Sequence, residues 1–171
     1  MHFDHVDGNG VFFSRYVRHS QLSNSDFTQV GDTAIAVVGA SGMHRTNQAA
    51  SLDYPAFNLI EGNHVGGVGV WGKQSAAYFK SVTRENTIKN NVFHDSPRSL
   101  VNYNDGAMGG ERMEGNILFN SVTESNDHGP FNSWDRRKSG NFCAASAIQP
   151  IPRLLSSGNG VHCLAVCAPP P

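Results

Sequence analysis

Charged side chains that could do chemistry recur at one spacing in the second half of the chain. Asp95 is followed 29 residues later by Glu124. Arg98 is followed at the same distance by Asp127, and His128 comes next. Two carboxylates about 5 Å apart suit a retaining glycosidase, in which one is the nucleophile and the other the acid/base. A mixed Arg, Asp and His cluster would equally suit a lyase, in which Arg or His takes the proton beside a sugar carboxylate neutralised by a cation.

Either chemistry requires these residues to lie on elements that repeat with the same period. The copies are Asn58–Val65, Asn86–Phe93 and Gly115–Val122, with a weaker fourth copy at Leu22–Phe27. Each copy has an aliphatic residue, two or three polar residues that include Asn, and a second apolar residue. Asn63 and Asn91 are 28 residues apart, and Asn91 and Asn120 are 29 apart. A repeat of this length predicts a stacked, repetitive fold.

Superposition of the copies predicts two apolar columns. They are Leu22, Ile60, Ile88, Ile117 and Phe27, Val65, Phe93, Val122. Helical repeats fit badly because Gly and Asn would lie in helix interiors. Short apolar and polar alternations broken by Asn and Gly are typical of short strands. The repeat therefore predicts an all-β right-handed parallel β-helix of about four coils over residues 1–136, with Asn63, Asn91 and Asn120 stacked as an amide ladder.

Residues in register on successive coils of such a fold are about 4.8 Å apart. The offset of 29 then places Asp95 on Glu124 and Arg98 on Asp127, with His128 nearby. These residues are candidate catalytic groups, and Arg98 is a candidate substrate ligand. The alternative is a solvated surface ladder in which Arg98 and Asp127 form a simple ion pair. Asp95 and Glu124 stacked alone would repel each other, which favours a functional role or a calcium ion between them.

Aromatic residues could hold a sugar ring by stacking. Trp134 lies beside Asp135, and both are candidate substrate ligands, although a buried Trp134 is equally compatible with the sequence. For Trp71, Tyr78 and Tyr103 core packing is favoured.

Several histidines also allow two interpretations. His94 precedes Asp95 and could be a general base, but a turn residue is favoured. His64 has no partner that the sequence places.

The pattern Asn-x-Ile-x-x-Asn-x-(Val/Phe) resembles the repeats of the pectate-lyase-like superfamily, which contains polysaccharide lyases, glycoside hydrolases and epimerases. Asp7–Tyr16, His94–Gly106 and Ser125–Arg136 resemble more specifically right-handed β-helix proteins thought to act on carbohydrate. The resemblance implies that Asp105, in a glycine-rich loop, borders the cleft and is a further acid candidate. Members usually have more coils and caps at both ends, so the resemblance implies a truncated member.

Length and charge exclude several classes of protein. The 171 residues suit one domain, and the net charge of −1 gives no support for nucleic-acid binding. No apolar stretch is long enough for a membrane span, and no signal peptide is visible. Residues 137–171 show no repeat and hold all three cysteines, so an irregular, disordered tail is expected there. No metal or cofactor site is indicated, apart from the calcium alternative.

The leading hypothesis is a glycoside hydrolase or polysaccharide lyase that acts on an extracellular polysaccharide through outward-facing acids on adjacent coils. The first alternative is a glycan-binding or adhesion module without catalysis. The second is an inactive fragment, because the repeat stops after Arg136. The expectation of an extracellular location rests on the resemblance alone.

Overall fold

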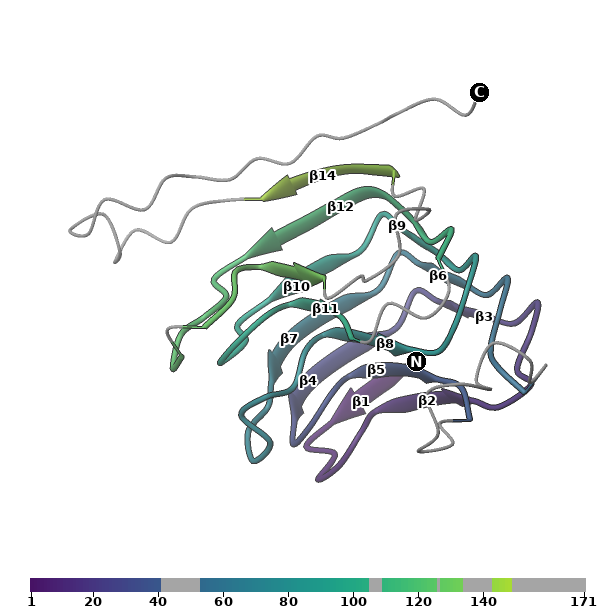
Figure 1. The fold of residues 1–171 in the computed structure, drawn as a ribbon. Coiled ribbons are helices and arrows are strands. Elements are labelled where there is room, and N and C mark those ends of the chain that lie inside the picture. The colour runs from purple at the N-terminus through teal and green to yellow at the C-terminus, as the bar shows by residue number, and fades with distance from the viewer. Residues whose placement is uncertain (41–52, 105–108, 126, 134–142, 149–171) are drawn as a thin grey trace.

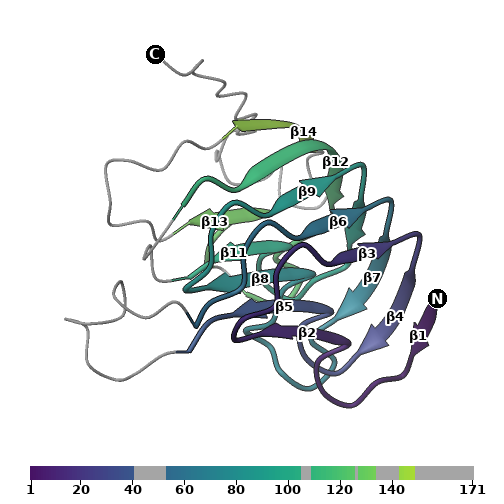
Figure 2. The ribbon, with the colours of Figure 1, turned by 90° about the vertical axis from the view of Figure 1, so that its right-hand side faces the viewer.

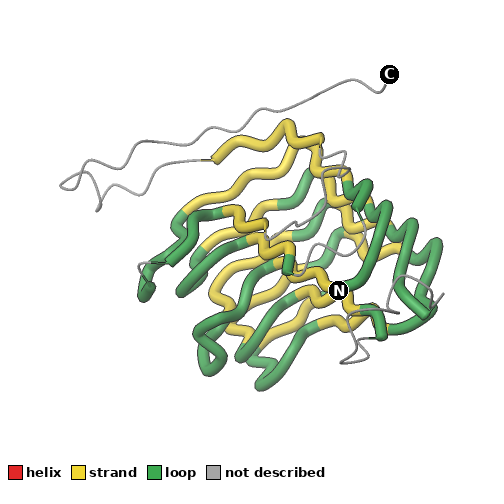
Figure 3. Tube along the Cα trace, in the orientation of Figure 1, coloured by secondary structure: helices red, strands yellow, loops and turns green. Residues whose placement is uncertain are grey.

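The structure is a computed structural model that describes residues 1–40, 53–104, 109–125, 127–133 and 143–148. Every regular element among these residues is a strand, and every strand pair is parallel (Figure 3). Within these ranges no helix is long and apolar enough to cross a membrane. The predicted all-β class is confirmed.

The strands form two sheets (Figure 1). The larger sheet has two rows that meet in one long strand. Its first row is β3 (Gln21–Ser23), β6 (Leu59–Glu61), β9 (Thr87–Lys89) and the first half of β12 (Arg112–Phe119). Its second row is β1 (His2–Asp4), β4 (Asp26–Val30), β7 (His64–Val68), β10 (Val92–His94) and the second half of β12. The smaller sheet is β2 (Val11–Ser14), β5 (Ile35–Val38), β8 (Tyr78–Ser81), β11 (Val101–Tyr103) and β13 (Phe131–Ser133).

The chain visits the first row, the second row and then the smaller sheet before it returns to the first row (Figure 2). The strands β6, β7 and β8, for example, follow one another along the chain and belong to these three rows in turn. Each interior strand is hydrogen-bonded to the corresponding strands of the preceding and following repeats, and β1, β2, β3 and β13 each pair on one side. Corresponding residues of successive repeats are therefore neighbours.

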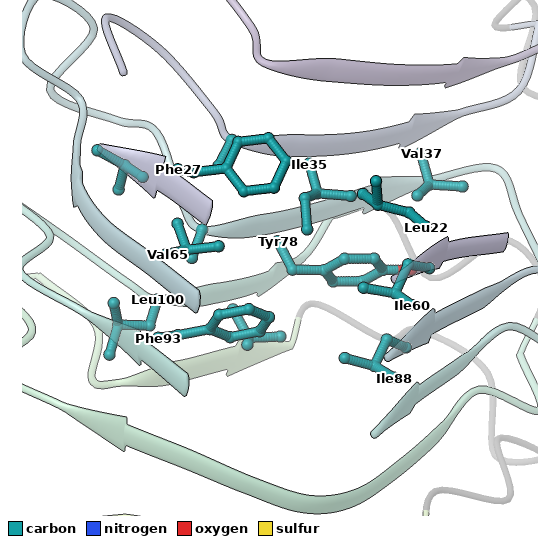
Figure 4. Packing of buried hydrophobic residues seen from close by; sticks show 14 of the residues in the cluster. Leu22, Phe27, Ile35, Val37, Ile60, Val65, Tyr78, Ile88, Phe93 and Leu100 are labelled. Carbon is teal, nitrogen blue, oxygen red and sulfur yellow. The ribbon is translucent and has the colours of Figure 1, made fainter. Parts of the chain in front are cut away.

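Two columns of apolar side chains fill the space between the sheets (Figure 4). Their members pair in register as Leu22, Ile60, Ile88, Met113 and as Phe27, Val65, Phe93, Leu118. Burial of each such side chain contributes about 1.5–3 kcal/mol. The first three members of each column are as predicted. The predicted last members, Ile117 and Val122, are wrong, and Ile117 is 42% exposed opposite Val92.

A ladder of buried asparagines runs along the bend between the two rows of the larger sheet. Asn63 donates its backbone N–H and its side-chain Nδ2 to Oδ1 of Asn91, at 2.9 and 3.0 Å. Asn91 donates in the same way to Oδ1 of Asn116, both at 2.9 Å. The residue before each of these asparagines has a positive φ, which Asn and Gly adopt most easily. The predicted ladder is confirmed for Asn63 and Asn91, but its next member is Asn116 and not Asn120.

These corrections share one cause. The last repeat has additional residues in one connection, and the sequence analysis places them at the wrong position. Asn91 and Asn116 are 25 residues apart, whereas the paired Asn102 and Asn132 are 30 apart. The extra residues therefore lie after β12, in the connection 120–130. The superposition of the repeats in the sequence places the extra residues before this strand. It therefore aligns Asn120 with Asn91, four residues after the true partner, Asn116.

A final strand, β14 (Cys143–Ile148), pairs in parallel with β12. It lies inside the segment 137–171, where the sequence predicts an irregular tail. The larger sheet thus extends past residue 136.

Candidate functional site

Connections between the second row and the smaller sheet bring polar side chains together. The connections 69–77, 95–100 and 120–130 carry most of them. Neighbouring connections are tied by backbone hydrogen bonds, such as that from Val122 N–H to the carbonyl of Arg98 at 2.8 Å. We use the name connection face for seven residues that these connections carry, namely Trp71, Lys73, Gln74, Arg98, Glu124, Asp127 and His128.

Arg98 lies at the centre of the connection face, and its side chain is 16% exposed. Its Nη2 donates to the carboxylate of Asp127 and to Nε2 of His128, and its Nη1 donates to Oε1 of Gln74 at 3.1 Å. A guanidinium can only donate, so Nε2 of His128 is the acceptor in this contact. The predicted pairing of Arg98 with Asp127, with His128 nearby, is confirmed. Gln74 was not anticipated.

Hydrogen bonds of Ser96 and the burial of Leu100 position Arg98. Ser96 is buried, donates its backbone N–H to the carbonyl of Asn120 at 3.2 Å, and donates its hydroxyl to the carbonyl of Ser99 at 3.0 Å. Leu100, which follows, is fully buried in the core. The connection is thus anchored on both sides of Arg98, which limits the orientations open to the guanidinium.

Glu124 and Asp95 are not stacked. Glu124 accepts an ion-pair hydrogen bond from Lys73 at 2.9 Å, and both side chains are about half exposed. Asp95 is instead next to Asn120, whose Nδ2 donates to its carboxylate. The predicted contact between Asp95 and Glu124 is wrong, because the offset at this point is 25 and not 29. A retaining pair of carboxylates and a calcium ion between these two residues both lose their geometric basis.

The aromatic candidates divide into exposed and buried side chains. Trp71 is 71% exposed, contrary to the favoured core packing, whereas Tyr78 and Tyr103 are buried as favoured. Trp71 thus presents its indole to solvent from the same connection as Lys73 and Gln74. Asp105, Trp134 and Asp135 lie outside the residues that the structure describes.

A second polar cluster lies on the outward face of the second row. Asp26 Oδ1 is 2.7 Å from Nδ1 of His64, and Nε2 of His64 is 2.8 Å from Nε2 of His94. Nδ1 of His94 is 2.8 Å from Oδ2 of Asp95. We call these four residues the histidine array. Strand alternation could have revealed it, because Phe27, Val65 and Phe93 point inward and their neighbours therefore point outward.

The carboxylate of Asp95 is hydrogen-bonded to two side chains, those of Asn120 and His94. Partial burial raises the pKa of Asp95, but hydrogen bonds with Asn120 and His94 outweigh this effect, so its pKa lies below the usual value. Asp95 is therefore a carboxylate at neutral pH.

Among the described residues, no three His, Cys, Asp or Glu side chains are grouped to hold a metal ion. Comparisons with protein-family models, curated proteins and solved structures found no match.

Proposed function

We propose that the chain folds as a right-handed parallel β-helix of the pectate-lyase-like kind and acts on a polysaccharide at its connection face. The cyclic path through three rows of parallel strands supports this fold. Such a fold hosts many chemistries, so the function rests on the site and not on the architecture.

The observation that carries the proposal is the arrangement around Arg98. Its guanidinium links Asp127 and His128, on the connection 120–130, with Gln74, on the connection 69–77. Fixed donors and acceptors of this kind suit recognition of sugar hydroxyl groups, since they demand defined hydrogen-bond directions. The exposed indole of Trp71 supplies an apolar face against which a sugar ring can stack.

The same face holds groups for bond cleavage. Asp127 and Glu124 are 63% and 53% exposed, so a bound sugar can reach both carboxylates. In hydrolysis these two acids would divide the roles of nucleophile or base and of proton donor. In elimination His128 would release its contact with Arg98 and take a proton from the sugar ring, the glycosidic oxygen would leave, and the product would contain a new double bond.

Glycan binding without turnover is the second candidate, and the ion pairs favour it. Glu124 is held by Lys73 and Asp127 by Arg98, so each carboxylate already has a cationic partner. An acid that protonates a leaving group must give up a proton, and ion-paired carboxylates are poor donors.

The test is incubation of the purified chain with a panel of neutral and acidic polysaccharides. Binding is measured by affinity electrophoresis, hydrolysis by new reducing ends, and elimination by new ultraviolet absorbance. Asp127→Asn and Glu124→Gln should abolish turnover, whereas Glu114→Gln should not, because Glu114 forms a comparable surface ion pair with Arg112 away from this face. Saturable binding without product would establish the binding module. If the chain bound no polysaccharide of the panel and formed no product, this result would contradict the proposal.

A further inference from the structure

The first strand of each row leaves one hydrogen-bonding edge open. Within the described part of the chain, β1, β2 and β3 each pair on one side only, and the partner of β1 is β4 (Figure 2). An edge of this kind is a template on which a further strand can pair. We call residues 1–23, which hold these three strands, the open end.

The backbone of β1 directs its hydrogen-bonding groups to its two sides in turn. The carbonyl of Met1 accepts a hydrogen bond from β4 at 2.8 Å, and the N–H of His5 donates one to β4 at 3.1 Å. Phe3 faces β4 as well, because alternate residues of a strand direct their backbone groups to the same side. The N–H and C=O groups of His2 and Asp4 therefore face away from β4, toward the open edge.

Two copies of β1 fit each other in one antiparallel register. In an antiparallel pair, residues whose backbone groups face the partner strand exchange both of their hydrogen bonds with the residue opposite. When Phe3 of one copy lies opposite Phe3 of the other, His2 of each copy lies opposite Asp4 of the other copy. Each copy then donates two backbone hydrogen bonds and accepts two, so this register uses the edge groups of both residues.

The side chains of β1 agree with this register. His2 and Asp4 are exposed on the same face of the strand, and opposite residues of an antiparallel pair share a face. The imidazole of His2 can therefore donate a hydrogen bond to the carboxylate of Asp4 in the other copy. Hydrogen bonds with Thr28 and His5 hold the pKa of Asp4 below its usual value, so this carboxylate is ionised at neutral pH.

Phe3 supplies the apolar centre of the contact. Its ring stacks on that of Phe27, with centroids 4.5 Å apart and planes 5° from parallel. Phe27 is fully buried, whereas Phe3 is only partly buried against the core. Val11 and Val17, which also belong to the open end, are partly buried in the same way. A second copy at the open end would cover more of this apolar surface.

We propose that two copies of the chain form a two-fold symmetric dimer through their β1 strands, in the antiparallel register centred on Phe3. Each contact then occurs twice, as a two-fold axis requires. The paired strands are short, so we expect weak, reversible association and not an obligate dimer. The dimer does not depend on the activity proposed for the connection face.

The first test is sedimentation equilibrium of the whole chain at concentrations from about 1 µM to about 1 mM. We expect an equilibrium between monomer and dimer without larger species, because β1 has one open side. His2→Pro removes an N–H that faces the open edge, and the symmetry of the dimer doubles the loss. This variant should weaken dimerisation about tenfold or more.

Gln21→Pro is the matched control, because it removes an edge N–H from β3. The carbonyl of Ser20 accepts a hydrogen bond from β6 at 2.9 Å, and the N–H of Asn24 donates one to β6 at 3.1 Å. The backbone groups of Gln21 therefore face away from β6, as those of His2 face away from β4. Gln21→Pro should leave dimerisation unchanged, since β3 takes no part in the pairing. A thermal melt checks that both variants fold.

A disulfide tests the register without a proline. Phe3 is the residue of β1 that lies opposite itself, and the Cα atoms of such a pair are about 4.5 Å apart, within the range of a disulfide. Phe3→Cys, in a chain whose three native cysteines are replaced by serine, should form a covalent dimer in oxidised glutathione. Gln21→Cys in the same background should not.

Several results would overturn the proposal. One is a chain that stays monomeric up to about 1 mM. Another is a dimer that His2→Pro and Gln21→Pro weaken equally, or one that Phe3→Cys does not cross-link. Species larger than a dimer would show addition of copies in a row and would contradict a closed two-fold pair. If His2→Pro does not fold, the cross-linking of Phe3→Cys against Gln21→Cys decides.

Discussion

Asn91 donates both its backbone N–H and its side-chain amide to Oδ1 of Asn116, 25 residues later in the sequence. Both asparagines are 1% exposed, so no solvent can replace this acceptor. The pair fixes the register between β10 and β12. The connection 120–130, which carries Glu124, Asp127 and His128, follows directly after β12.

We predict that Asn116→Ala lowers the free energy of unfolding by at least about 2 kcal/mol. The substitution leaves two buried donors of Asn91 without their acceptor, and each such group costs about 1–3 kcal/mol. Asn120→Gly is the control, since Gly tolerates the positive φ of Asn120 and only the hydrogen bond to Asp95 is lost. It should cost less than about 1 kcal/mol. Urea unfolding measures both values, and a larger loss for Asn120→Gly would contradict the ladder.

The core contains an ion pair whose removal should be costly. Lys80 Nζ and Glu111 Oε2 are 3.0 Å apart, and their side chains are 4% and 2% exposed. Lys80→Met leaves an isolated buried carboxylate, so we predict a loss of about 3–5 kcal/mol. Lys80→Met combined with Glu111→Leu should recover most of it. Denaturant unfolding of the single and double variants measures the difference.

The exposed pair Arg112 and Glu114, whose atoms are 2.7 Å apart, supplies the comparison. Arg112→Met should cost less than about 1 kcal/mol, because surface ion pairs contribute little. Equal losses for Lys80→Met and Arg112→Met would contradict the buried character of the first pair.

Stability should depend on pH through Glu111. Burial raises the pKa of Glu111, and the ion pair with Lys80 only partly opposes this effect. The folded state therefore binds the Glu111 proton more tightly than the unfolded state. The contribution of Glu111 to stability is present at low pH and declines as the pH rises from the ordinary carboxyl range through the raised pKa.

The measurement is the free energy of unfolding of the wild type and of Glu111→Gln at a series of pH values. Glutamine has no proton to lose, so the variant should gain stability relative to the wild type as the pH rises. The pKa of Asp95 is lowered, so its contribution to the pH dependence of stability has the opposite sign. Because Asp95 is present in both proteins, its contribution cancels in the comparison. A difference that does not change with pH would contradict the prediction.

Trp71 should contribute to polysaccharide affinity. We predict that Trp71→Ala weakens binding about tenfold, which corresponds to about 1.4 kcal/mol, because the stacking face is lost. Phe12→Ala is the control, since Phe12 is 54% exposed on β2, outside the connection face. Affinity electrophoresis of the two variants measures the effect. Equal weakening by both would remove Trp71 from the site.

Regular spacing explains why much of the fold could be predicted. Asn63 and Asn91 are 28 residues apart, and the same spacing separates the buried Ile60 and Ile88, which pair in register. The last repeat breaks the pattern, because Asn116 and Asn120 both follow plausible strands. The triplet Glu114-Gly115-Asn116 repeats Glu61-Gly62-Asn63 and was the signal that favoured Asn116.

Contacts of the candidate site could be predicted only where they did not depend on the register between β10 and β12. Arg98 and Asp127 are 29 residues apart in both the prediction and the structure, because the extra residues fall just before Asp127. The contact between His64 and His94 was missed because it is diagonal. His64 pairs in register with Val92, and its ring reaches His94 over the side-chain gap left by Gly66.

The most direct test of the proposed polysaccharide site is hydrogen exchange of the whole chain, with and without the polysaccharide that binds most tightly in the panel. We predict slower exchange in the connections 69–77, 95–100 and 120–125, which carry Trp71, Arg98 and Glu124. The amides of β2, on the smaller sheet, should exchange at an unchanged rate. Protection confined to β2, or no protection in the three connections at saturation, would contradict a polysaccharide site at the connection face.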